Sequence, residues 1–254
     1  MGKLESLCLK SDEILQKAYC PIRKDCTDSE RLKSKLRFPY KRSSKTEGDS
    51  NSKKVEVRVS EQESRFAFVE AIIQDDDLQY CVETPTAKTY NFQDKSNKGN
   101  PIVDENGQSA MMDMTLFSNE EEINIEFKSQ GISKEATDHM VIRKDLLKLM
   151  AEGKNGLFHH LYKSANKGTI PGLLGVCRLY LNEHIEYINK EQYILFHIHV
   201  LDPGHSSGSG YSITKKLILS EYKSNFFNYE HTDYENTMKE ASNGWKYSRY
   251  KVEC

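Results

Sequence analysis

Asp113, Glu126 and Lys128 could together do chemistry, because each lies on the polar face of a segment whose other face is apolar. The segments are "SAMMDMTLF" (109–117) and "INIEFKS" (123–129), and side chains on a strand alternate between its two faces. The turn-forming stretch "SNEEE" between them predicts a β-hairpin. We therefore expect two carboxylates and an ammonium group on one face of adjacent antiparallel strands.

Such a face suits magnesium chemistry. Mg²⁺ prefers hard oxygen ligands, so Asp113 and Glu126 are candidate ligands for one or two ions, and the carbonyl of Phe127 could complete the shell. Mn²⁺ would be an expected substitute. The metal would polarise a scissile phosphate and lower the pKa of a bound water, while Lys128 orients that water or neutralises developing charge. Phosphodiester hydrolysis needs these parts.

The pattern resembles the PD-(D/E)XK nuclease superfamily, which includes restriction endonucleases, Holliday-junction resolvases and antiviral effectors. The matching residues are "MD" at 112–113 and "EFK" at 126–128, preceded by the acidic segment "ESRFAFVEAII" and followed by "RKDLLKLM". Met112 stands where proline is nominal. The resemblance implies a restriction-endonuclease-like α/β fold, in which helices flank a mixed β-sheet. It also implies that Asp113 and Glu126 are metal ligands and that Lys128 is the catalytic lysine.

The preceding helix usually supplies a further glutamate in that family, and Glu63 and Glu70 both match this role. They are seven residues apart, so they lie nearly above one another on a helix. Glu63 is slightly favoured as a catalytic and metal-binding residue, because it opens the helix on an "ExR" pattern. We expect this helix to begin near Ser60 or Glu61 and to bury a stripe of Phe66, Val69 and Ile73.

The order of the remaining segments predicts three regions. Residues 1–54 are expected to form a basic, partly helical or disordered arm, 55–221 the nuclease-like core, and 222–254 an aromatic, polar extension. Within the core, 138–152 reads as a helix and "YILFHIHVL" as a buried strand. Residues 154–176 read as a second helical or irregular insert, which would place His159 and His160 on a helix.

Positive charge is concentrated between residues 31 and 54, where nine Lys or Arg stand against two acids, giving +7. Such a run could pair with phosphates, and Phe38 and Tyr40 could stack on bases. The ordinary interpretation is a solvated linker, because the Ser, Lys, Gly and Asp content of 43–54 cannot bury much apolar area.

Other groups of residues allow less specific interpretations. His197 and His199 share one strand face and, with Asp202 or His205, could bind a transition metal. They could equally be partly buried sheet residues or hydrogen-bond donors beside the phosphate site. On the helix after the hairpin, Asp145 and Lys148 form an ordinary i, i+3 ion pair, from which Lys148 could reach a substrate backbone. The six cysteines form no CxxC pair, which suits reduced thiols.

These observations predict a magnesium-dependent endonuclease that acts on DNA, of the restriction or phage-defence kind. The alternative is a catalytically inactive nuclease-fold module that binds nucleic acid or a protein partner. A homodimer is plausible, because one such site cuts one strand. No stretch approaches the roughly 18 to 20 apolar residues of a membrane span, and the N-terminus lacks the apolar centre of a signal peptide. A cytoplasmic location with no membrane partner is therefore expected.

Overall fold

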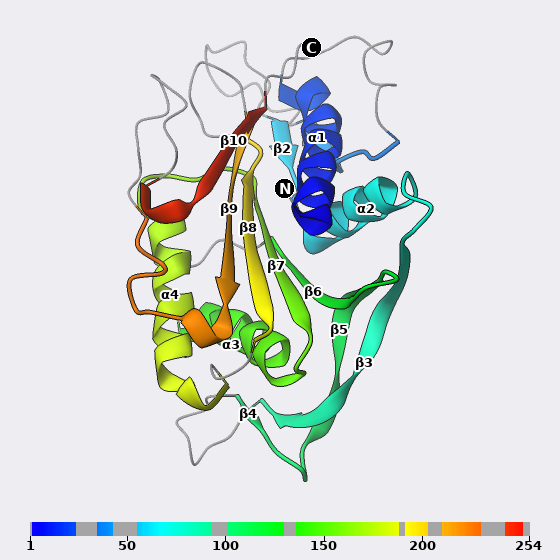
Figure 1. The fold of residues 1–254 in the computed structure, drawn as a ribbon. Helices are drawn as coiled ribbons and strands as arrows, with labels where there is room; N and C mark the ends of the chain where they lie inside the picture. The colour runs from blue at the N-terminus through cyan, green and yellow to red at the C-terminus, as the bar shows by residue number, and fades with distance from the viewer. Residues whose placement is uncertain are drawn as a thin grey trace.

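Eight strands form one open, mixed β-sheet in the computed structural model of the chain (Figure 1). The structure describes residues 2–23, 35–42, 55–92, 101–129, 136–187, 191–202, 210–229 and 242–250. The strands of the sheet are β3 (Gln79–Asn91), β4 (Ile102–Val103), β5 (Gln108–Phe117), β6 (Glu122–Lys128), β7 (Asn155–Tyr162), β8 (Tyr193–Val200), β9 (Gly210–Ile218) and β10 (Lys246–Tyr250). Two further strands, β1 (Tyr40–Arg42) and β2 (Val55–Val57), pair separately as an antiparallel ribbon.

The spatial order of the sheet is β10-β9-β8-β7-β6-β5-β3-β4. The central strands β6, β7 and β8 are parallel to one another, and the outer strands pair antiparallel. The hairpin predicted around "SNEEE" is therefore present as β5 and β6. The expected mixed α/β class is confirmed.

Helices cover both faces of the sheet (Figure 1). They are α1 (Lys3–Arg23), α2 (Glu61–Ile72), α3 (Ala136–Ala151) and α4 (Thr169–Glu183), with short 3₁₀ turns at Ile185–Tyr187, Leu219–Glu221 and Ser242–Gly244. One hydrophobic cluster joins α1 and α2 to the side chains of one face, including Ile125 and Phe127. A second joins α3 and α4 to the other face, including Phe158 and Phe196. β7 and β8 therefore present alternate residues to two different cores, whereas β6 presents apolar residues to the first core and polar residues to the other face.

Helix α2 begins where the sequence indicates, with Ser60 as its N-cap. Its expected buried stripe is wrong, because Phe66 is 58% exposed and Ile73, just beyond the helix, is 69% exposed. The helix instead buries Ser64, Ala67, Phe68, Ala71 and Ile72. The helix therefore packs with a different face from the predicted one, and its Glu61 and Arg65 contact Lys128 and Asp113.

The expectation of a helical insert after α3 is also wrong. Residues 155–162 form β7, a strand buried at the centre of the sheet, so His159 and His160 lie on a strand and not on a helix. A short apolar run between two helices gives no clear period, since a fully buried strand and a buried helix look alike in sequence. The helix of this region, α4, begins only at Thr169.

Parts of the expected arm and extension pack with the core. Leu7 and Leu15 of α1 are buried in the same cluster as the sheet, and β10 extends the sheet beside β9. Phe38 is 3% exposed and packs edge-on against Tyr19, so it is not available to stack on bases. Most of the basic run lies outside the described residues. Among the helices that the structure describes, none is long and apolar enough to cross a membrane.

Candidate active site at the β5–β6 fork

Strands β5 and β6 separate at the point where the predicted carboxylates stand. Their pairing runs from Phe117↔Glu122 as far as Met114↔Ile125. Beyond it, the Asp113 side chain enters the gap, and its Oδ2 accepts a hydrogen bond from the backbone N–H of Phe127 at 2.8 Å. A side-chain carboxylate thus takes the place of a ladder hydrogen bond and holds Asp113 beside β6.

Glu126 and Lys128 project from β6 toward α3. The ammonium nitrogen of Lys148 lies 2.6 Å from Oε1 of Glu126, and Lys128 Nζ lies 2.9 Å from Oδ2 of Asp145. Asp145 and Lys148 also pair with each other along α3 at 3.2 Å, as their i, i+3 spacing predicts. The helix after the hairpin therefore supplies one anion and one cation to the predicted site.

The first turns of α2 complete the group from the other side. Lys128 Nζ lies 3.2 Å from Oε1 of Glu61, and Arg65 donates a hydrogen bond of 3.0 Å to Oδ1 of Asp113. Glu61 and Arg65 stand four residues apart, so they lie on one helix face. Side chains from α2 and α3 thus converge on the β5–β6 fork.

The two helix glutamates considered in the sequence occupy other positions. The Glu63 carboxylate accepts hydrogen bonds from the backbone N–H of Ser60 at 2.7 Å and from its hydroxyl at 2.5 Å, which is a capping box. Glu70 is partly exposed near the far end of α2. Within the described part of the chain, Glu61 is the α2 glutamate that contacts Lys128.

The exposed fraction of the side chains increases from one end of the site to the other. The side chain of Glu126 is 1% exposed, that of Lys128 11%, that of Asp113 20% and that of Glu61 31%. The Asp113–Glu61 end is therefore the part of the group that solvent reaches. The backbone of Phe127 offers its N–H to Asp113, while metal binding by its carbonyl stays a prediction.

Charge at the fork is crowded. Burial and the nearby Asp145 carboxylate raise the pKa of Glu126 well above its ordinary value, and Asp113 adds to the rise. Burial alone would lower the pKa of Lys128, but the carboxylates of Asp145 and Glu61 outweigh it and raise the pKa. An oxygen-rich site with this excess of repulsion favours an added cation.

The formal charges of the side chains in the site also show that carboxylates outnumber cations. Four carboxylates stand against three cations, namely Glu61, Asp113, Glu126 and Asp145 against Arg65, Lys128 and Lys148. The formal charge is therefore −1 when all seven side chains are ionised, and 0 when Glu126, whose pKa is raised, holds a proton. Hydrolysis of a phosphodiester uses the same inventory, with carboxylates for a metal and cations for phosphate oxygens.

The structure describes some, but not all, of the other metal ligands predicted from the sequence. His197 and His199 do share one face of β8, as their alternation predicts, and both are fully buried. They face α1, and both contact Asp12 of that helix. His205 lies outside the described residues.

Comparisons with known proteins find no match. No family model matches the chain, and neither does any curated protein or solved structure.

Proposed function

We propose that the chain is a metal-dependent nuclease whose active site is the β5–β6 fork. The observation that carries the proposal is the convergence of Asp113, Glu126 and Lys128 where the two strands separate, beside the acidic end of α2. The order along the chain is helix, aspartate, Glu-x-Lys, helix, which is the order of the PD-(D/E)XK resemblance. This supports a restriction-endonuclease-like core within the mixed sheet.

Asp113 and Glu126 would hold the metal, with Glu61 as the α2 carboxylate nearest to the exposed end. The fit rests on their chemistry, because Mg²⁺ and Mn²⁺ prefer hard oxygen donors and the neighbouring carboxylates raise the pKa of Glu126 despite its pair with Lys148. When bound, the metal supplies polarisation of the scissile phosphate and a more acidic water. Arg65 and Lys148 pair with these carboxylates in its place, so metal entry must displace or share those ion pairs.

Lys128 acts beside the metal ligands. Its raised pKa keeps it an ammonium at neutral pH, so it donates hydrogen bonds and does not remove a proton. It can orient the attacking water and neutralise charge that develops on the phosphate oxygens. The water oxygen forms the new bond to phosphorus and gives a proton to solvent, while the bond to the leaving sugar oxygen breaks and that oxygen takes up a proton from solvent.

One observation favours the alternative function, a nuclease-fold module that binds nucleic acid or a protein partner without cleaving. Both proposed metal ligands already have a cationic side chain within ion-pair distance. If Mg²⁺ cannot displace these partners, the fork is a structural ion-pair network. Cleavage separates the two functions directly.

The test is cleavage of supercoiled plasmid by the full chain in Mg²⁺ or Mn²⁺, with a chelator as the negative arm. Asp113→Asn and Glu126→Gln should each abolish cleavage and weaken Mg²⁺ binding measured by calorimetry. Glu122→Gln is the matched control, because Glu122 lies on the same strand and pairs with Lys154 away from the fork. Linear single-stranded DNA and RNA are tested in parallel. Absence of metal-dependent cleavage of all three substrates would overturn the proposal.

A further inference from the structure

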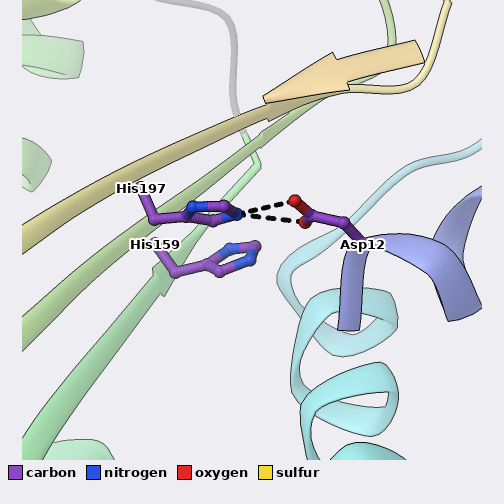
Figure 2. A group of neighbouring side chains, drawn as sticks. All are labelled: Asp12, His159 and His197. Carbon is purple, nitrogen blue, oxygen red and sulfur yellow. Dashed lines mark hydrogen bonds and ion pairs between the residues drawn. The ribbon is translucent and has the colours of Figure 1, made fainter. Parts of the chain in front are cut away.

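Three buried side chains from distant parts of the chain meet on the opposite face of the sheet. Asp12 comes from α1, His159 from β7 and His197 from β8, and each has 0% exposure. One ligand atom from each lies within 4.8 Å of the others. Figure 2 shows both imidazole rings extending side by side toward the Asp12 carboxylate, with contacts drawn only from His197.

His159 is the unexplained member of this group. Among the residues that the structure describes, neither of its ring nitrogens has a hydrogen-bond partner. A fully buried polar group without a partner is costly, and most native proteins avoid it. The ring packs between Phe127 and His197, with centroids 5.4 and 5.0 Å away, so it is held in place while its nitrogens remain unused.

The other members are held as metal ligands commonly are. Nδ1 of His197 lies 2.7 Å from the Thr214 hydroxyl, and its Nε2 lies 3.0 Å from Asp12. The hydroxyl of Tyr250 donates to Oδ2 of Asp12 at 2.7 Å, and Nδ1 of His199 lies 3.2 Å from Oδ1. Hydrogen bonds of this kind fix the orientation of an imidazole and a carboxylate that bind a metal.

We propose that Asp12, His159 and His197 bind one divalent first-row transition-metal ion, of which Zn²⁺ fits best. Two imidazoles and a carboxylate are a donor set that zinc accepts in four-coordinate geometry. The fourth position can be filled by the second oxygen of Asp12. Binding needs only a modest contraction, because ligand atoms around a tetrahedral zinc lie roughly 3.4 Å apart, from bond lengths near 2.1 Å.

This ion would be structural. Its three ligands are closed to solvent, in contrast to the open end of the β5–β6 fork. It would tie α1 to the parallel strands β7 and β8, directly behind Phe127 of the nuclease strand. The inference is independent of the proposed nuclease activity, because it uses different residues on the other face of the sheet.

The first test is the metal content of the full chain, purified without a polyhistidine tag and measured by inductively coupled plasma mass spectrometry. About one transition-metal ion per chain is expected in the wild type after dialysis against Mg²⁺-containing buffer. His159→Leu and Asp12→Asn should lose it. His184→Ala, a buried histidine on the other face, and Asp113→Asn, at the nuclease fork, should keep it.

The second test asks whether His159→Leu lowers or raises the melting temperature. If the metal is present, a strong chelator should lower the melting temperature of the wild type. His159→Leu should also lower the melting temperature, and the chelator should then have no further effect. If no metal binds, replacing an unpaired buried imidazole with an apolar group of similar size should leave the melting temperature unchanged or raise it.

A third measurement does not depend on any variant folding. Wild-type protein loaded with Co²⁺ should show the strong visible absorption of a four-coordinate ion, and X-ray absorption should report nitrogen and oxygen ligands without sulfur. A wild-type chain that holds no transition metal after incubation with Zn²⁺, Co²⁺, Ni²⁺, Mn²⁺ or Fe²⁺ would overturn the proposal. So would a His159→Leu variant with wild-type metal content.

Discussion

The Lys148 ammonium lies 2.6 Å from a carboxylate oxygen of Glu126, across the interface between α3 and β6. Both side chains are almost fully enclosed, with 10% and 1% exposure. A lysine in this position performs the electrostatic task that a metal ion would perform at the same carboxylate. If the fork binds a metal as proposed, that ion would replace Lys148 at this carboxylate.

Lys148→Met should destabilise the metal-free protein by about 3 kcal/mol, because a buried carboxylate would lose its nearest cation. Added Mg²⁺ should recover part of the loss. Urea denaturation with and without Mg²⁺ measures both effects. Lys154→Met is the control, since its pair with Glu122 is more than a third exposed and should contribute no more than about 1 kcal/mol. Equal costs in the two variants would remove Lys148 from the site.

Lys128→Ala should slow single-turnover cleavage by roughly 100-fold or more while Mg²⁺ and substrate binding are retained, because the lost group acts on charge in the transition state. Lys128→Arg should rescue poorly, since a broad guanidinium cannot replace a compact ammonium beside the attacking water. A wild-type rate in Lys128→Ala would leave "INIEFKS" with only a structural role.

The three glutamates of α2 should separate by function. Glu61→Gln should reduce cleavage, because Glu61 contacts Lys128. Glu63→Gln should instead lower stability by about 0.5–1 kcal/mol through the weakened helix cap, with cleavage by the folded protein retained. Glu70→Gln should alter neither. Cleavage rates and unfolding free energies of the three variants decide the assignment, and a loss of cleavage confined to Glu63→Gln would reverse it.

The basic run should contribute to binding by charge alone. Replacing Arg31, Lys33, Lys35 and Arg37 with Gln should weaken DNA affinity and flatten its salt dependence by roughly 0.9 in the log–log slope per lost phosphate contact. Phe38 is kept, because it is part of the core. The same number of neutralised lysines elsewhere on the surface serves as control, and an unchanged slope would return the run to the status of a linker.

Strand periodicity is what made part of the site predictable. The faces of Asp113, Glu126 and Lys128 follow from a two-residue period that is visible in the sequence, and the turn between the strands is equally clear. The contribution of α2 was harder to predict, because its buried face mixes small residues with Phe68 and Ile72 while Phe66 is exposed. The i, i+4 spacing of Glu61 and Arg65 was the signal available for finding the correct face.

The Asp12 cluster was beyond sequence reasoning for a different reason. His159 lies in a short buried strand with no distinguishing period, and Asp12 lies in a segment that reads as a separate arm. Their meeting depends on pairings between residues far apart in the chain, which no local pattern records. His197 and His199 could be placed on a common face, but the partner across from them could not be named.

The docking of α1 has a consequence for the order of events during synthesis. Asp12 meets His197 across 185 positions and Tyr250 across 238. α1 can pack on α2 as soon as both helices have been made, but its contacts with His197 and Tyr250 must wait until β8 and β10 have left the ribosome. Folding by such distant contacts is slow and exposes apolar surface to aggregation meanwhile. A nascent chain arrested before residue 193 should therefore bind chaperones more strongly than one from which β8 and β10 have already emerged.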